Sequence, residues 1–222
     1  SALCQRAADL NAPFGRYELL ERIGGDEGIE AYRARSSGVA GFEKIVAVTK
    51  ILPELASDPD TISLLIAEAK RSADLTHANI AQVFEFGVIE KIYFLAAEYV
   101  PGKNFRLVNR QFQDVRRTMP LPMLLHIALS VCSALSYAHR RGQGGSNGAG
   151  VVHGHLQPRN IIISYEGAVK VVDFGLAKAR ALWKKKRKLI PDDVGYWAPE
   201  QRNGEAVDHR ADLFALGVLL YE

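Results

Sequence analysis

Cysteine is scarce in this chain of 222 residues, which contains only Cys4 and Cys132. Two cysteines so far apart build no disulfide framework and lack the close spacing of metal-ligand pairs. We therefore expect a reducing, cytoplasmic location. A secretory signal is not recognisable either, and the chain does not begin with methionine, so we expect a fragment or a trimmed chain.

A strong excess of charge is also missing. The net charge is +3 and charged residues make up 24% of the chain, which argues against nucleic acid as a partner. The longest apolar stretch, Leu121–Ala138, is interrupted by His126, Ser130, Ser133 and Ser136. We interpret it as a core helix and predict no membrane segment in this chain.

The pattern of expected elements changes near residue 100. The first part reads as strands around one helix, whereas the second part is mainly helical. This order predicts an α+β fold of two lobes with a hinge near Glu98–Gly102. The expected strands are Tyr17–Ile23, Ala31–Ala34, Ile45–Leu52, Ile80–Gly87, Ile92–Tyr99, Ile161–Ile163 and Val169–Val172, and the expected helices are Ser63–Leu75, Leu121–Arg140 and Ala211–Tyr221. Glycine density predicts a flexible loop at Gly142–Gly150.

A series of short motifs runs along the chain in a fixed order. They are the turn Gly24–Gly28, Val46–Thr49, Glu68, His77–Ile80, Ala97–Val100, the loop Val151–Asn160, Asp173–Gly175, Ala198–Glu200 and Asp212–Gly217. From Tyr17 onward this series resembles the eukaryotic-like, or Hanks-type, serine/threonine protein kinase family of bacteria.

The resemblance implies a kinase-like architecture with an antiparallel sheet and one main helix in its N-lobe. It places a flexible lead-in at 1–15, the N-lobe at 16–100, and a mainly helical C-lobe, truncated at its C-terminus, at 101–222. It also implies ATP and Mg²⁺ as ligands, because phosphoryl transfer by this fold relies on positioning and electrostatics. Implied nucleotide contacts are Gly24, Ala47, Lys50, Glu98, Val100 and Asp173, with Asn160 and Asp173 as metal ligands.

The lysine that such a fold uses to hold phosphate is absent from its position. Thr49 stands there, and Lys50 follows it. Successive strand residues point to opposite faces, so Lys50 is expected to project away from the cleft unless a one-residue bulge turns it inward. Glu68, the usual partner of that lysine, is then expected to bond to Thr49 or to be solvated.

The catalytic loop and the glycine-rich turn depart from the family as well. In the family, His is followed by Arg and then by the Asp that acts as the catalytic base. Here Gly154 and His155 follow His153, so the position of the base carries a histidine and is degenerate. The three glycine positions of the turn fall on Gly24, Asp26 and Ile29, of which only the first is kept. Asp26, Glu27 and Glu30 are expected to repel a triphosphate, or else Gly25 and Gly28 restore the flexibility of the turn.

The segment from residue 174 to 200 contains neither serine nor threonine, so the family's phosphorylation site is absent. Asp193 replaces a threonine that, in the family, contacts the catalytic Asp at the position of His155. Lys184–Lys188 is either a solvated run of charge or a docking surface for an acidic or phosphorylated protein partner.

The departures together predict a pseudokinase, a signalling scaffold in which ATP and Mg²⁺ bind weakly or not at all. The alternative is an active serine/threonine kinase that uses Lys50 for phosphate and His155 as base.

Overall fold

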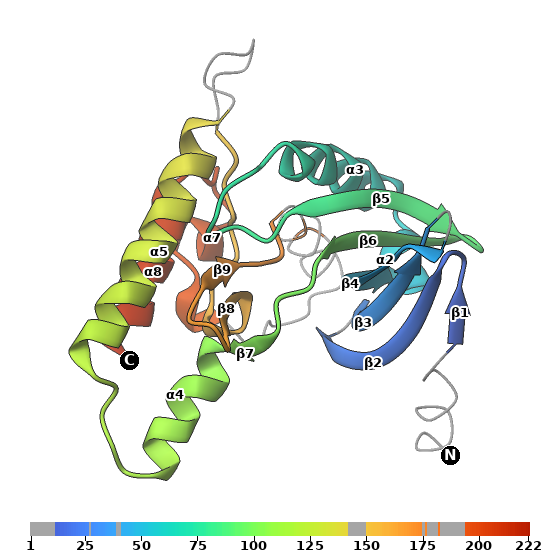
Figure 1. Cartoon of the computed structure of the whole chain (residues 1–222). Coiled ribbons are helices and arrows are strands. Elements are labelled where there is room, and N and C mark those ends of the chain that lie inside the picture. The colour runs from blue at the N-terminus through green and yellow to red at the C-terminus, as the bar shows by residue number, and fades with distance from the viewer. Residues whose placement is uncertain are drawn as a thin grey trace.

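The computed structural model describes residues 12–26, 28–38, 41–141, 150–174, 176, 182 and 194–222. They form a sheet-rich N-lobe and a mainly helical C-lobe, which confirms the predicted two-lobe α+β arrangement (Figure 1). The predicted loop at 142–149 and the basic run Lys184–Lys188 lie outside the described residues.

The N-lobe is built on a six-stranded sheet in the order β1-β2-β3-β4-β6-β5, in which all neighbouring strands are antiparallel. Two helices accompany the sheet (Figure 1). The elements are β1 (Ala12–Phe14), β2 (Tyr17–Asp26), β3 (Ile29–Ser37), β4 (Glu43–Ile51), α2 (Pro53–Ala56), α3 (Pro59–Ala73), β5 (Val83–Ile89) and β6 (Ile92–Glu98).

Strand β1 lies within the predicted lead-in 1–15, so that prediction is wrong for Ala12–Phe14. The strand pairs with β2, and the Phe14 side chain is buried in edge-to-face contact with Phe94, with ring centroids 5.6 Å apart. A strand of three residues is too short to show an alternating pattern, so its burial depends on packing that the sequence does not display.

Helix α3 begins four residues earlier than the sequence pattern predicted. Asp58 caps its N-terminus by accepting a hydrogen bond from the Thr61 amide at 3.0 Å, and Pro59 occupies the first turn. Both are start signals for a helix. The apolar face of α3 turns inward, which brings Leu65, Glu68 and Ala69 into the interior of the N-lobe.

The C-lobe is organised around α5, which lies beside α8 and against the small sheet (Figure 1). Its elements are β7 (Gly102–Asn104), α4 (Phe105–Asp114), α5 (Leu121–Arg140), the 3₁₀ turn η2 (Pro158–Asn160), β8 (Ile161–Ser164), β9 (Val169–Val171), the 3₁₀ turn η3 (Val194–Tyr196), α7 (Pro199–Asn203) and α8 (Arg210–Tyr221). Strands β7, β8 and β9 form a separate antiparallel sheet in that order.

Helix α5 has the bounds that the sequence predicted. Among the described helices it alone reaches the length and apolar composition of a bilayer-crossing segment. One of its faces is buried in the C-lobe core through Ile127, Val131 and Leu135, whereas Leu121, Leu125 and Leu129 are exposed, so the predicted core helix is buried on one side only. Helix α4 was not predicted, because most of its residues are polar and its apolar face is short. Its start depends on a cap at Asn104, whose side chain accepts from the Leu107 amide at 2.9 Å.

Candidate functional site

A cavity of about 360 Å³ opens between the glycine-rich turn and strands of the N-lobe and the η2–β9 part of the C-lobe. Apolar residues make up most of its wall, and several polar side chains from the end of β6 and from the C-lobe also reach it, as in a site for a small molecule. The lining residues are Ile23, Gly24, Gly25, Ile29, Ala31, Ala47, Thr49, Ala81, Val83, Leu95, Ala97, Glu98, Tyr99, Val100, Asn104, Gln157, Arg159, Asn160, Ile162, Val172, Asp173 and Phe174.

Most of the predicted site residues line this cavity. They are Gly24, Ala47, Thr49, Glu98, Val100, Asn160 and Asp173. Three predicted residues, Lys50, Glu68 and His155, are not among its lining side chains. The structure therefore brings the implied nucleotide and metal positions together. Of the two groups that could replace lost catalytic residues, Lys50 lies on the other face of its strand, and His155 lies next to the lining residues Gln157 and Asn160.

Lys50 faces away from the cavity, as strand geometry predicted, so its assignment as a nucleotide contact is wrong. The β3–β4 and β4–β6 registers run without a shift at this position, which leaves no bulge to rotate the side chain. The Lys50 ammonium instead lies 5.2 Å from the centre of the Phe14 ring and 5.7 Å from that of Tyr32. Thr49 alone of the pair turns toward the cavity, and it carries no charge.

Glu68 is buried on α3 with only 2% of its surface exposed, so the predicted solvated position is wrong. Arg71, one turn further along the same helix, forms an ion pair with the Glu68 carboxylate. The ion pair offsets part of the cost of burying the Glu68 carboxylate. The sequence spacing i, i+3 on a helix is the signal that could have identified this pair.

The glycine-rich turn is a hairpin between β2 and β3, with Gly25 opposite Glu30 and Asp26 opposite Ile29. Gly25 has a positive φ of 126°, and a side chain there would approach the Ile29 carbonyl oxygen to 2.6 Å, so glycine is required. The expected repulsion from Glu30 is wrong, because its carboxylate bonds to the Tyr32 hydroxyl on the face opposite the cavity-lining Ile29.

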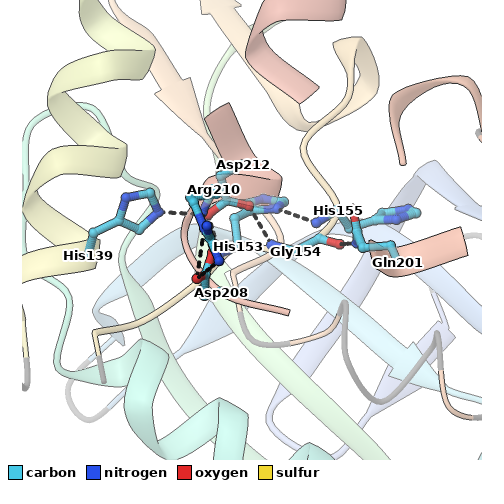
Figure 2. A network of polar contacts seen from close by, with 8 residues as sticks. All are labelled: His139, His153, Gly154, His155, Gln201, Asp208, Arg210 and Asp212. Carbon is cyan, nitrogen blue, oxygen red and sulfur yellow. Dashed lines mark hydrogen bonds and ion pairs between the residues drawn. The ribbon is translucent and has the colours of Figure 1, made fainter. Parts of the chain in front are cut away.

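The catalytic-loop segment is anchored by one buried carboxylate, that of Asp212 at the start of α8 (Figure 2). Its Oδ2 accepts from the His153 amide at 2.9 Å and bonds to His139 Nε2 at 2.7 Å, while its Oδ1 accepts from the Gly154 amide at 2.7 Å. Gln201 donates to the Gly154 carbonyl at 2.8 Å. The loop is thus held through its backbone.

The His153 ring is part of the same buried network. Its Nδ1 accepts from the His155 amide at 3.2 Å, so its Nε2 carries the proton and donates to the Val172 carbonyl at 3.0 Å. Burial lowers the pKa of His153, because desolvation penalises the charged ring. The ring also meets Phe174 edge-to-face, with centroids 4.6 Å apart. These contacts support the predicted packing role of His153.

His155 is half-buried beside the cavity, at the degenerate base position. The side-chain amide nitrogen of Gln157 lies 2.9 Å from His155 Nε2 and donates a hydrogen bond to it. This bond engages the lone pair that His155 would need in order to act as a base. The His155 carbonyl accepts from the Asn160 side-chain amide at 2.9 Å. Position 155 therefore supports the shape of the loop as it stands.

Asn160 and Asp173 fit a magnesium ion, because they offer amide and carboxylate oxygens at one cavity and the Asn160 nitrogen is already used by the His155 carbonyl. Asp173 has a positive φ of 65°, which Asp and Asn tolerate better than most residues. Burial raises the pKa of the Asp173 carboxyl, and the nearby His155 opposes that rise.

We expect Asp173→Asn to stabilise the domain at neutral pH. A raised folded-state pKa means that the ionised Asp173 destabilises the fold above that pKa, whereas an amide carries no such penalty. Denaturant unfolding of both proteins, from pH 8 down to the ordinary pKa of an aspartate at about 3.9, measures the effect. The advantage of the variant should shrink as pH falls and the native carboxyl takes up its proton. An unchanged difference across this range would contradict the interpretation.

Sequence reasoning missed two parts of the site. Gln157 and Arg159 line the cavity beside Asn160, and Arg159 supplies the only positive charge among the described lining residues. The His139–Asp212 contact joins residues 73 positions apart, so no local spacing announces it. Gly175 and Asp193, which the sequence placed near the site, lie outside the described residues.

Comparison with known proteins identifies the fold. The protein kinase domain family matches residues 17–222, and the chain belongs to this family. It is 36% identical over 211 residues to the tyrosine-protein kinase MasK of Myxococcus xanthus, covering 95% of this chain and 33% of that protein. It is 32% identical over 216 residues to the serine/threonine-protein kinase PknB of Mycobacterium leprae, covering 93% of this chain and 32% of that protein.

Solved structures agree with the sequence relationship. A crystal structure of a mutant form of the Mycobacterium tuberculosis PknI kinase domain matches with a TM-score of 0.72 and 25% identity, over 95% of this chain and 74% of that one. The predicted kinase family and fold are therefore confirmed. The chain spans about a third of the length of the MasK and PknB proteins that it matches.

Proposed function

We propose that this domain is a pseudokinase, a kinase fold that serves as a signalling scaffold or regulatory module with weak or absent phosphoryl transfer. One observation carries the proposal. Thr49 faces the cavity at the position of the phosphate-holding lysine, and Lys50 lies on the other face of the same strand against Phe14 and Tyr32. The charge that should meet the phosphates is thus absent from this wall.

The catalytic loop supports the same function. A positioned base contributes about 10²–10⁴ to a rate. His155 offers an imidazole whose Nε2 is engaged by Gln157, and no side chain at position 154 can bind an activating phosphate. A lost charge-stabilising donor costs about 10²–10³ more, although the two factors need not multiply.

The residues that remain would bind and orient ligands. Glu98 and Val100 would lie beside the adenine ring of ATP, and Asn160 and Asp173 would hold Mg²⁺. When bound, the metal neutralises charge on the phosphates. Weak binding of ATP and Mg²⁺ is therefore compatible with this site, while efficient transfer is not.

The second candidate function is an active protein kinase that transfers the γ-phosphate of ATP to protein side chains. The shared placement of Asn160 and Asp173 at one cavity favours it, as do the kinase names of the relatives. For either function we propose a cytoplasmic protein with a protein partner, and an acidic or phosphorylated one if Lys184–Lys188 takes part in docking.

Incubation with labelled ATP and Mg²⁺ tests the pseudokinase proposal. We expect no incorporation of label into this chain or into a general protein substrate above the level of an Asp173→Ala variant. That variant is the matched control, because it removes the one carboxylate that the described C-lobe residues contribute to the cavity lining. Clear autophosphorylation that disappears in Asp173→Ala would overturn the proposal in favour of the active kinase.

A further inference from the structure

We infer that the cavity selects an uncharged, flat heterocyclic ligand of nucleoside type over the corresponding di- or triphosphate. This inference rests on the proposed function, since it concerns the same cavity. It goes further by naming the class of ligand that the cavity would bind. It also states that phosphate groups on this ligand would lower its affinity.

The inner part of the cavity suits a flat apolar ring. Ala47 and Ala97 line it with small side chains, which leave space between the sheet and the C-lobe. Tyr99 and Val100 line one edge, beyond the end of the β4–β6 ladder at Glu98. Their peptide groups are outside that ladder, so they offer donors and acceptors to the polar edge of a heterocycle.

The end of the cavity beneath the glycine-rich turn is apolar. Ile29, at the family's third glycine position, lines the cavity and packs in a buried cluster with Ile51, Leu65 and Leu176. Leu176 belongs to the segment after Phe174 and is 1% exposed within this N-lobe cluster. Phosphates directed toward this end would therefore meet aliphatic side chains and the neutral Thr49, and they would lose water without gaining a charged partner from the residues that the structure describes there.

The charges around the cavity do not offset this cost. Asp173 and Glu98 both contribute carboxylates, and the Glu98 carboxylate is already paired with Lys170 at 2.8 Å. Arg159 is exposed on η2 of the C-lobe, on the opposite side of the cavity from Ile29. The Asp173 carboxylate opposes the binding of a polyanion by like-charge repulsion, and the charge of an exposed arginine is partly screened by solvent.

Isothermal titration calorimetry of the whole chain with adenosine, AMP, ADP and ATP, each with and without Mg²⁺, tests this inference. We expect adenosine to bind at least about tenfold more tightly than ATP, because no buried cation among the described lining residues meets the phosphates. Thr49→Lys, which places an ammonium at the cavity, should shift the order toward ATP. Lys50→Met is the matched control and should leave the order unchanged, since Lys50 lies on the other face.

Two results would overturn the inference. The first is ATP–Mg²⁺ binding more tightly than adenosine in the unmodified chain, particularly if Arg159→Ala abolishes the difference. The second is the absence of binding by every compound in the series. Neither result touches the pseudokinase proposal, which fails only if the labelling experiment shows transfer that depends on Asp173.

Discussion

Replacing Asp212 by alanine is expected to lower the free energy of unfolding by about 3–5 kcal/mol, because it leaves buried polar groups without their partner. The carboxylate is 1% exposed and bonds to two backbone amides and to His139. Alanine would leave the backbone amides of His153 and Gly154 without the carboxylate that accepts their hydrogen bonds. Chemical denaturation followed by fluorescence and circular dichroism measures the change.

Asp208, four residues before Asp212, provides the control variant. Asp208 forms an ion pair with Arg210 at 3.0 Å, but both side chains are exposed, and exposed pairs contribute little to stability (Figure 2). Asp208 also accepts a bond from the exposed Arg210 amide at 2.8 Å, so Asp208→Ala should lower the unfolding midpoint only slightly and much less than Asp212→Ala. If Asp212→Ala fails to fold, Asp212→Asn should give a smaller, measurable loss, because one oxygen remains as acceptor. A midpoint unaffected by both Asp212 variants would refute the anchoring role.

The double variant Thr49→Lys with His155→Asp is expected to raise phosphoryl transfer by about 10²–10⁴-fold over the unmodified chain. The lysine would project into the cavity from β4, as Thr49 does, and the aspartate would stand at the base position. Gly154 is left in place. Its φ is 70°, and a side chain in this left-handed region costs about 1–2 kcal/mol.

Two further variants show which group produces the gain. Thr49→Lys with His155→Asn has the shape of the double variant without the base, and Thr49→Met with His155→Asp has the base without the charge. Both should transfer less phosphate than the double variant in a single-turnover assay with labelled ATP. A folded double variant without any gain would contradict the view that Thr49 and His155 limit transfer, and would direct attention to Asp26 and Ile29 in the glycine-rich turn.

Most of the fold was predictable because long periodic segments dominate it. Helix α5 and strands β2, β4 and β6 follow patterns that the sequence displays directly. The missed elements are short or polar: β1 has three residues, and α4 begins at an Asn104 cap. Such elements are specified by tertiary contacts and capping bonds more than by periodicity.

The site was predictable where one strand or one motif decides it. Alternation along β4 was sufficient to separate Thr49 from Lys50. The ion pair of Glu68 was not predicted, because the family pattern points to a partner on β4, whereas Arg71 lies on the same helix. The buried network of Asp212, His139 and His153 joins distant parts of the chain, which only the folded structure brings together.

The backbone anchoring of the catalytic loop has an evolutionary consequence. Asp212 binds main-chain amides, and these are present whatever side chains occupy positions 154 and 155. The geometry of the loop at these two positions therefore depends little on their side chains. A chain built in this way can exchange a catalytic side chain without a folding defect to select against the change, so that a former enzyme can persist as a stable binding protein.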